Sequence, residues 1–142
     1  YKIDFYVLGD WGKYEKEDTD GEEGNGDDEQ PVSETIFQEE VAEAMILYRN
    51  SRNISLDYIV SVGDNFYMEG VMSAFDTLWD TVWRDVYLKM SDALRVPWHA
   101  VLGNHDYGSG VAGTDAQIER STATDDFEVP PPVLLLLLLC SH

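Results

Sequence analysis

Three apolar runs, separated by amphipathic segments, set the organisation of this chain. Residues 3–8 are apolar or aromatic except for Asp4, and this pattern predicts a buried β-strand. Residues 57–62 and 98–102 show the same pattern and predict two further strands. Each run ends at a glycine, which marks the point where the strand gives way to a turn.

The segments between the strands predict two helices, over residues 33–48 and 75–87. Apolar residues recur at helical spacing in both segments, and each set predicts a face that packs on the core. The first set is Phe37, Val41, Ala44, Met45 and Tyr48, and the second is Phe75, Trp79, Val82, Val86 and Tyr87. The order strand–helix–strand–helix–strand predicts an α/β fold with a parallel βαβαβ core and right-handed crossovers.

The pattern weakens toward the end of the chain. Residues 115–120 predict a short helix, and the prolines at 130–132 break any regular element. We interpret residues 1–132 as one partial domain and residues 133–142 as a truncated or non-native apolar tail. The apolar run in that tail is far shorter than the ~20 residues that span a bilayer, so no membrane span is expected.

The charge of the chain is strongly acidic and uneven. The net charge of −19 argues against a nucleic-acid-binding surface, because phosphate backbones attract basic patches. Nine carboxylates and one lysine lie in the segment 15–30, which we interpret as a solvated acidic loop. The alternative is a cation-binding segment, although it lacks the ligand spacing of an EF-hand.

Two features bear on where the protein resides. The chain opens at Tyr1, directly before the first strand, which suggests that an upstream segment such as a signal peptide is absent. Asn53-Ile54-Ser55 is a sequon for N-glycosylation, which fits a secreted glycoprotein.

A short motif follows each predicted strand, and together the three motifs carry the candidate chemistry. They are Gly9-Asp10-Trp11-Gly12, Gly63-Asp64-Asn65-Phe66-Tyr67 and Gly103-Asn104-His105-Asp106. Because parallel strands end at one edge of a sheet, where ligands bind in open α/β folds, we expect Asp10, Asp64 and Asn104 to meet there. Carboxylate and amide oxygens suit hard cations, and a carboxylate can bridge two of them.

This series of motifs resembles the metallophosphoesterases, and most closely the purple acid phosphatases in their small, tartrate-resistant form. The resemblance runs from Ile3 to Pro132, and the tyrosine of the second motif is its most discriminating residue. It implies the N-terminal half of an αββα sandwich, with the metal motifs at the carboxyl ends of the strands. It also implies an iron-containing hydrolase that is secreted, lysosomal or vacuolar.

The resemblance implies a role for each matching residue in a binuclear centre of Fe(III) with a second Fe, Zn or Mn. Asp10 resembles the terminal ligand of the ferric ion, and Asp64 resembles the carboxylate that bridges the metals. Tyr67 resembles the tyrosinate ligand whose charge transfer gives the colour. Asn104 resembles a ligand of the second metal that also contacts the phosphate.

The catalytic roles are implied for the last motif. His105 resembles the histidine that binds the substrate or protonates the leaving group, and Asp106 is expected to orient it. In the family, a metal-bound hydroxide attacks phosphate monoesters at acid pH. The expected substrate is therefore a small phosphate monoester or a phosphoprotein.

The ligand set is incomplete. The family completes its centre with three further histidines, whereas this chain has only His99, His105 and His142, none in a matching context. We therefore expect the 142-residue chain to be inactive alone. Two alternatives stay open: a metallophosphoesterase acting on diesters or phosphoproteins, and a non-enzymatic acidic fragment that binds a cation or a partner.

Overall fold

A three-stranded parallel sheet forms the centre of the molecule. The computed structural model describes residues 1–12 and 34–122. The strands are β1 (Phe5–Leu8), β2 (Tyr58–Ser61) and β3 (Trp98–Ala100), and they lie in the order β1-β2-β3. Both pairings are parallel, which confirms the predicted βαβαβ core.

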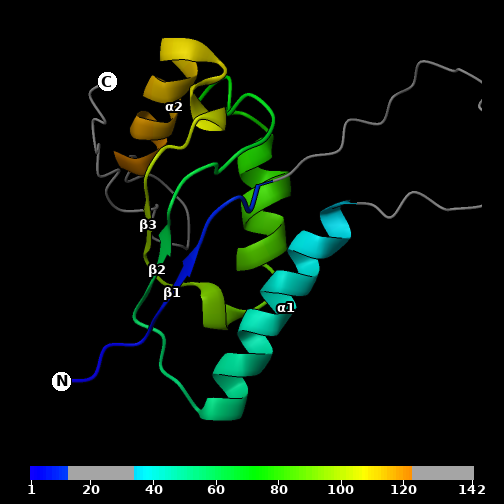
Figure 1. The fold of residues 1–142 in the computed structure, drawn as a ribbon, viewed down its shortest axis with the longest axis vertical. Coiled ribbons are helices and arrows are strands. Elements are labelled where there is room, and N and C mark those ends of the chain that lie inside the picture. Colours follow the sequence, from blue (N-terminus) through cyan, green and yellow to red (C-terminus); the bar gives the residue numbers. More distant parts are fainter. Residues whose placement is uncertain (13–33, 123–142) are drawn as a thin grey trace, which may run out of the picture.

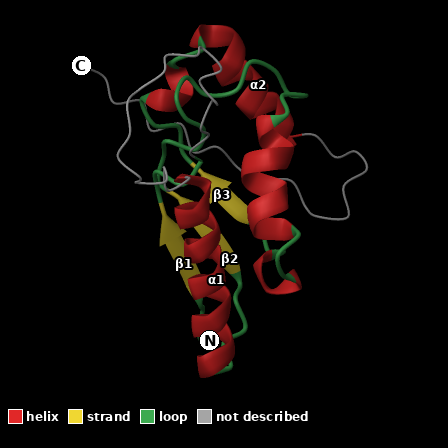
Figure 2. Ribbon diagram, turned by 90° about the vertical axis from the view of Figure 1, so that its right-hand side faces the viewer, coloured by secondary structure: helices red, strands yellow, loops and turns green. Residues whose placement is uncertain are grey.

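The helices pack mainly on one face of this sheet. They are α1 (Glu34–Arg52), η1 (Trp79–Leu88), η2 (Asp92–Leu94), η3 (His105–Tyr107) and α2 (Gly110–Thr122). Figure 1 shows α1 and η1 on the same side of the strands, and Figure 2 shows them in front of the sheet. The last helix, α2, lies beyond the carboxyl ends of the strands and is longer than the short helix predicted there.

An aromatic cluster fills the space between the sheet and the helices. Its rings meet mostly edge to face, the geometry that aromatic quadrupoles favour. Trp98 is central, with its ring centroid 5.7 Å from that of Trp11 and 5.1 Å from that of Tyr87. The other members are Phe66, Trp79 and Trp83. All four tryptophans of the chain are therefore buried in the core.

The buried face of α1 differs from the predicted one. Phe37, Val41 and Tyr48 are each about half exposed, whereas Gln38 and Ala42 are buried. Two hydrogen bonds fix this rotation: the Gln38 side-chain amide donates to the Val82 carbonyl, and the Tyr6 hydroxyl donates to a carbonyl of α1. Of the predicted apolar stripe of α1, Met45 packs against the core, while Phe37, Val41 and Tyr48 are not covered by other described residues.

The described residues cover the sheet on one face only. Phe5 is 48% exposed and Val7 is 57% exposed, whereas Tyr6 and Leu8 on the other face are partly buried against the core. The prediction that the first strand is buried is therefore wrong. On the same open face the ring of Phe5 stacks on that of Tyr58, and His99 packs edge-on against Tyr58. Among the described residues, the strands thus present an aromatic surface to solvent.

The helix η1 begins later than predicted. Asp76 accepts hydrogen bonds from the backbone N–H groups of Met72 and Leu78, and this turn holds residues 72–78 outside the helix. Phe75 therefore lies in the turn and is 89% exposed, which contradicts its predicted place in the buried stripe. The other four predicted members of that stripe are buried.

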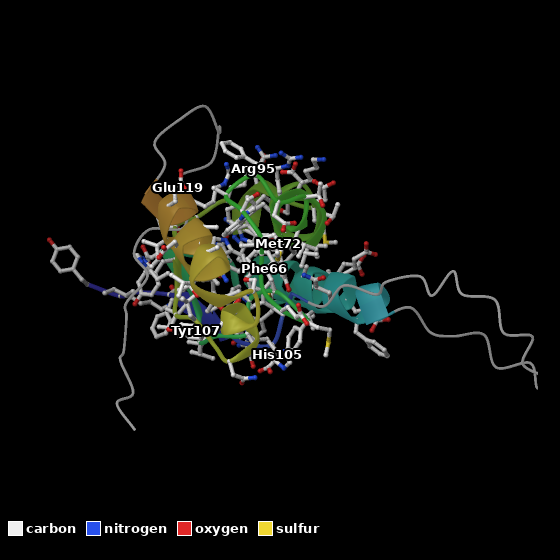
Figure 3. All side chains as sticks on the ribbon, turned by 90° about the horizontal axis from the view of Figure 1, so that it is seen from above. Phe66, Met72, Arg95, His105, Tyr107 and Glu119 are labelled. Carbon is white, nitrogen blue, oxygen red and sulfur yellow. The ribbon has the colours of Figure 1, made fainter. Side chains whose placement is uncertain are left out.

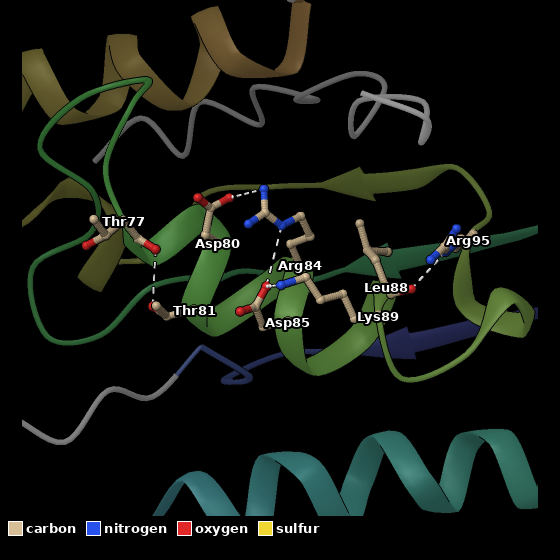
Figure 4. Close-up of polar contacts among 8 residues, drawn as sticks. All are labelled: Thr77, Asp80, Thr81, Arg84, Asp85, Leu88, Lys89 and Arg95. Carbon is tan, nitrogen blue, oxygen red and sulfur yellow. Dashed lines mark hydrogen bonds and ion pairs between the residues drawn. The ribbon is translucent and has the colours of Figure 1, made fainter. Parts of the chain in front are cut away.

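The outer face of η1 is polar. Figure 4 shows Arg84 paired with Asp80 at 2.7 Å, one turn apart, and Lys89 paired with Asp85 at 2.8 Å. The Lys89 N–H donates to the Arg84 carbonyl five residues back, a π-helical spacing. Exposed pairs of this kind contribute little to stability, so the aromatic face of η1 is what holds it on the sheet.

Some sequence predictions fall outside the described residues. These are the acidic loop at 15–30 and the apolar tail at 133–142. Within the part of the chain that the structure describes, no helix is both long enough and apolar enough to cross a membrane.

We predict that Trp98→Ala lowers the free energy of unfolding by about 3–5 kcal/mol, because it leaves a cavity among the aromatic rings. Phe75→Ala is the matched control and should change it by less than about 0.5 kcal/mol, since the side chain is 89% exposed. Urea denaturation followed by far-UV circular dichroism measures both. Equal losses in the two variants would show that Trp98 is not part of the core.

Candidate metal centre

The three motifs form one continuous rim at the carboxyl ends of the strands. Asp10 lies two residues beyond β1, and its N–H donates to the Gly63 carbonyl beyond β2 at 3.1 Å. Asp64 follows Gly63, and the N–H of His105 donates to its carboxylate oxygen Oδ1 at 2.9 Å. The structure therefore brings together the segments that the sequence predicts to meet.

Backbone geometry at the rim is unusual. Asp10 has φ of 55° and Asp64 has φ of 51°, in the left-handed region that non-glycine residues rarely adopt. Gly63, with φ of 113°, makes the turn before Asp64. A Cβ on Gly103 would lie 2.1 Å from the Asp64 carboxylate, so only glycine permits this approach. Such strained residues cluster at functional sites.

The hydroxyl of Tyr67 lies near two carboxylate oxygens, one from Asp10 and one from Asp64. It donates to Asp10 Oδ1 at 2.6 Å and lies 3.5 Å from Asp64 Oδ2. Burial raises the pKa of Tyr67 far above its usual value, and the hydrogen bond to Asp10 and the charge of Asp64 act in the same direction. Tyr67 is therefore a neutral phenol that donates its hydrogen bond to Asp10.

Asn104 and His105 lie beside this group. Asn104 is exposed, and its side chain does not cap the short helix η3. The His105 ring packs against Tyr67 with 4.3 Å between ring centroids, and its Nδ1 lies 2.7 Å from the Met68 carbonyl oxygen. Figure 3 shows Phe66 in the interior and His105 toward the periphery.

The carbonyl of Met68 determines the tautomer of His105. A carbonyl oxygen only accepts, so Nδ1 must carry the proton that it donates. In the neutral ring Nε2 is then the acceptor, and in the imidazolium form it carries the second proton. Nε2 is thus the atom of His105 through which a proton can be exchanged.

Asp106 does not orient His105, contrary to the prediction. Its side chain is fully buried and accepts hydrogen bonds from the backbone N–H groups of Asn65, Phe66 and Gly103. The side-chain amides of Asn65 and Gln117 also donate to it. The carboxylate therefore joins the second and third motifs, because the turn at η3 directs it inward while His105 points outward.

Burial raises the pKa of Asp106, whereas the N–H donors from Asn65, Gly103, Gln117 and Phe66 act to lower it. These donors converge on both carboxylate oxygens, which is the arrangement that an ionised carboxylate requires.

Sequence reasoning assigned no role to Asn65, Ser61 or Gln117. All three are polar and buried: Ser61 is 0%, Asn65 2% and Gln117 3% exposed. Asn65 lies inside the second motif, between Asp64 and Phe66. This position is the only feature of the sequence that could have indicated a role for it. Gln117 lies on α2, in a segment that also resembles the family, but that resemblance gives it no hydrogen-bonding role.

The donor set suits a hard cation. Asp10, Asp64 and Tyr67 offer carboxylate and phenol oxygens, which hard metal ions prefer over sulfur and imidazole. Within the described residues, no group of three or more histidine, cysteine or acidic side chains could hold a metal ion. The three side chains bring oxygen donors to one part of the rim, where Tyr67 is hydrogen bonded to Asp10 and lies near Asp64.

Comparison with known proteins identifies the family. The model of the calcineurin-like phosphoesterase family matches residues 3–137, so the chain belongs to that family. The parallel sheet with motifs at its carboxyl edge agrees with the N-terminal half of that fold. Membership implies a metal cofactor, although it does not specify which metals.

Curated relatives match over most of this chain. It is 31% identical over 128 residues to the tartrate-resistant acid phosphatase type 5 of Sus scrofa, covering 90% of this chain and 32% of that protein. It is 31% identical over 109 residues to purple acid phosphatase 3 of Arabidopsis thaliana, covering 77% of this chain and 24% of that protein. The chain thus spans a third or less of these relatives.

A solved structure supports the fold. It is titled GAP50, the anchor in the inner membrane complex of Plasmodium, and it superposes with a TM-score of 0.60 at 24% sequence identity. The match covers 93% of this chain and 33% of that one. At this identity the likeness concerns the fold alone.

We predict that Asp106→Asn lowers the free energy of unfolding by about 2–4 kcal/mol, because an amide NH₂ would face the N–H donors and leave them unsatisfied. Asp115→Asn, on the exposed side of α2, is the control and should change it by less than about 0.5 kcal/mol. Chemical denaturation at neutral pH measures both. An unchanged stability for Asp106→Asn would mean that the carboxyl group is protonated in the native state.

Proposed function

We propose that this chain is part of an acid phosphatase that hydrolyses phosphate monoesters, either small molecules or phosphoproteins, at a binuclear metal centre. The observation that carries the proposal is the convergence of Asp10, Asp64 and Tyr67, with a phenol placed between two carboxylates. Relatives named as acid phosphatases support the same reaction. The proposed metals are Fe(III) with a second Fe, Zn or Mn.

Each residue of the rim has a proposed task. Asp10 and Tyr67 would hold the ferric ion, Asp64 would contact both metals, and Asn104 would hold the second metal and contact the phosphate. When bound, the metals supply positive charge and an activated water for attack on phosphorus. The exposed Asn104 side chain is free of a capping role and is therefore available for this contact.

His105 is the proposed substrate-binding and proton-donating residue. Its Nδ1–H is held by the Met68 carbonyl, so the ring presents Nε2 away from the protein backbone. A protonated Nε2 donates a hydrogen bond to a phosphate oxygen or gives its proton to the leaving alkoxide. Asp106 serves this step indirectly, by fixing the backbone on which His105 stands.

The described residues supply too few ligands for both metals. Asp64 and Asn104 are the only residues proposed for the second ion, and neither is an imidazole. We therefore infer that this chain, expressed by itself, binds a ferric ion weakly and does not turn over substrate.

The test combines metal loading with an activity assay. Ferric iron added to the purified 142-residue chain should produce a visible charge-transfer band, because Tyr67 becomes a phenolate ligand. Tyr67→Phe should abolish the band, whereas Tyr107→Phe, a nearby exposed tyrosine, should retain it. With iron and zinc present, hydrolysis of an aryl phosphate in acidic buffer should not exceed that of Asp64→Asn.

Each part of this test has a result that would contradict the proposal. A band that survives in Tyr67→Phe would remove Tyr67 from the site, and no band in the unmodified chain would refute the ferric site. Turnover above the Asp64→Asn variant would refute the inference that the chain is inactive alone.

The proposed location is secreted, lysosomal or vacuolar, and the sequon at Asn53 provides a test. Asn53 is exposed, follows α1, and lies at the end of the sheet opposite the rim. When the chain is directed through the secretory pathway of a eukaryotic host, we expect a mass increase that an amidase for N-glycans reverses. Asn53→Gln should abolish the increase. An unchanged mass for the unmodified chain, beside a glycosylated reporter, would contradict the prediction.

A further inference from the structure

Asn65 is a buried amide whose every hydrogen-bonding position is occupied. Its Nδ2 donates to the Val101 carbonyl at 2.9 Å and to Asp106 Oδ2 at 3.0 Å. Its Oδ1 accepts from the Ser61 hydroxyl and from Trp11 Nε1. An amide side chain has two donors and two acceptor sites, so this one is fully satisfied at 2% exposure.

The partners of Asn65 adjoin the candidate site residues in sequence. Trp11 follows Asp10, and Asp106 follows His105. Asn65 itself follows Asp64, and its backbone N–H donates to both carboxylate oxygens of Asp106. The Asn65 side chain therefore binds the residues next to Asp10 and His105, and Asn65 is itself the residue next to Asp64.

The same contacts explain how strained backbone persists at the rim. Asp10 and Asp64 both hold a left-handed φ, and such residues persist only where their surroundings over-determine them. Asn65 is fixed through both its backbone and its side chain, so the preceding Asp64 has little freedom. Asp10 is restrained from the other side, because the Trp11 indole is hydrogen bonded to Ser61 at 2.7 Å and to Asn65.

We infer that Asn65 is a positioning residue for the metal centre: it touches neither metal nor substrate, and it holds Asp10, Asp64 and His105 at their mutual distances. This inference rests on the proposed function for the identity of the site. The positioning itself has a readout that needs no metal.

The metal-free readout is amide hydrogen exchange of the full 142-residue chain. The His105 N–H donates to Asp64 Oδ1, so its protection reports whether Asp64 is in place. Asn65→Leu keeps the number and branching of the side-chain heavy atoms and removes all four side-chain hydrogen bonds. Leu94→Ala is the matched control, because Leu94 is fully buried before β3, at the opposite end of the sheet.

We expect the His105 amide to exchange at least about tenfold faster in Asn65→Leu than in Leu94→Ala, at denaturant concentrations that equalise their global stabilities. Equal exchange in the two variants would overturn the inference, because it would mean that Asn65 supports only the fold. If Asn65→Leu does not fold, Ser61→Ala, which removes one of the donors to Asn65, gives the same comparison with a smaller effect.

Ferric binding supplies the second readout. Loss of a residue that supports metal ligands typically weakens metal affinity about 10–100-fold, and we expect this for Asn65→Leu and not for Leu94→Ala. Equal affinities in both variants would overturn the role of Asn65 at the metal centre. Absence of ferric binding by the unmodified chain would instead refute the proposed function, and faster His105 exchange in Asn65→Leu would still support the positioning of Asp64.

Discussion

The hydrogen bonds between Asn65 and Asp106 are the constraint on which the rest of the site depends. A buried carboxylate and a buried amide are costly unless every polar atom finds a partner, and here the partners include residues that follow all three strands. The hydrogen bonds of this cluster are therefore nearly all formed together or nearly all lost together. When the three turns are in place the polar atoms are satisfied, and displacing one turn leaves charged or polar atoms buried without partners.

This polar cluster is continuous with the aromatic core. Trp11 belongs to both: its ring packs against Phe66, Tyr87 and Trp98, and its indole N–H reaches Ser61. Packing of the Trp11 ring fixes the position of the first motif against the core. The hydrogen bond of its indole N–H fixes the orientation of the ring. Packing of the aromatic layer is thereby transmitted to Asp10, one residue away and exposed at the rim.

Much of this arrangement could be read from the chain before any coordinates. Apolar runs that end at glycine predicted three parallel strands, and strand order then placed Asp10 and Asp64 at one edge. The position of α1 could not be derived in the same way. An amphipathic pattern shows that Phe37, Val41 and Tyr48 form an apolar face, but it does not show whether another element covers that face.

Local sequence also gave an incomplete view of the site. Asp106 stands next to His105, and adjacency suggested that one orients the other. In a tight helical turn, however, successive side chains point in different directions, so the carboxylate turns inward and the ring turns outward. The contribution of Gln117 depends on how α2 packs, which no local pattern encodes.

The open aromatic face of the sheet has a consequence for handling the protein in solution. Exposed apolar strands favour self-association, and the net charge of −19 opposes it through electrostatic repulsion between molecules. That repulsion vanishes near the isoelectric point of about 4.1. Colloidal stability is therefore lowest in acidic solutions near that pH.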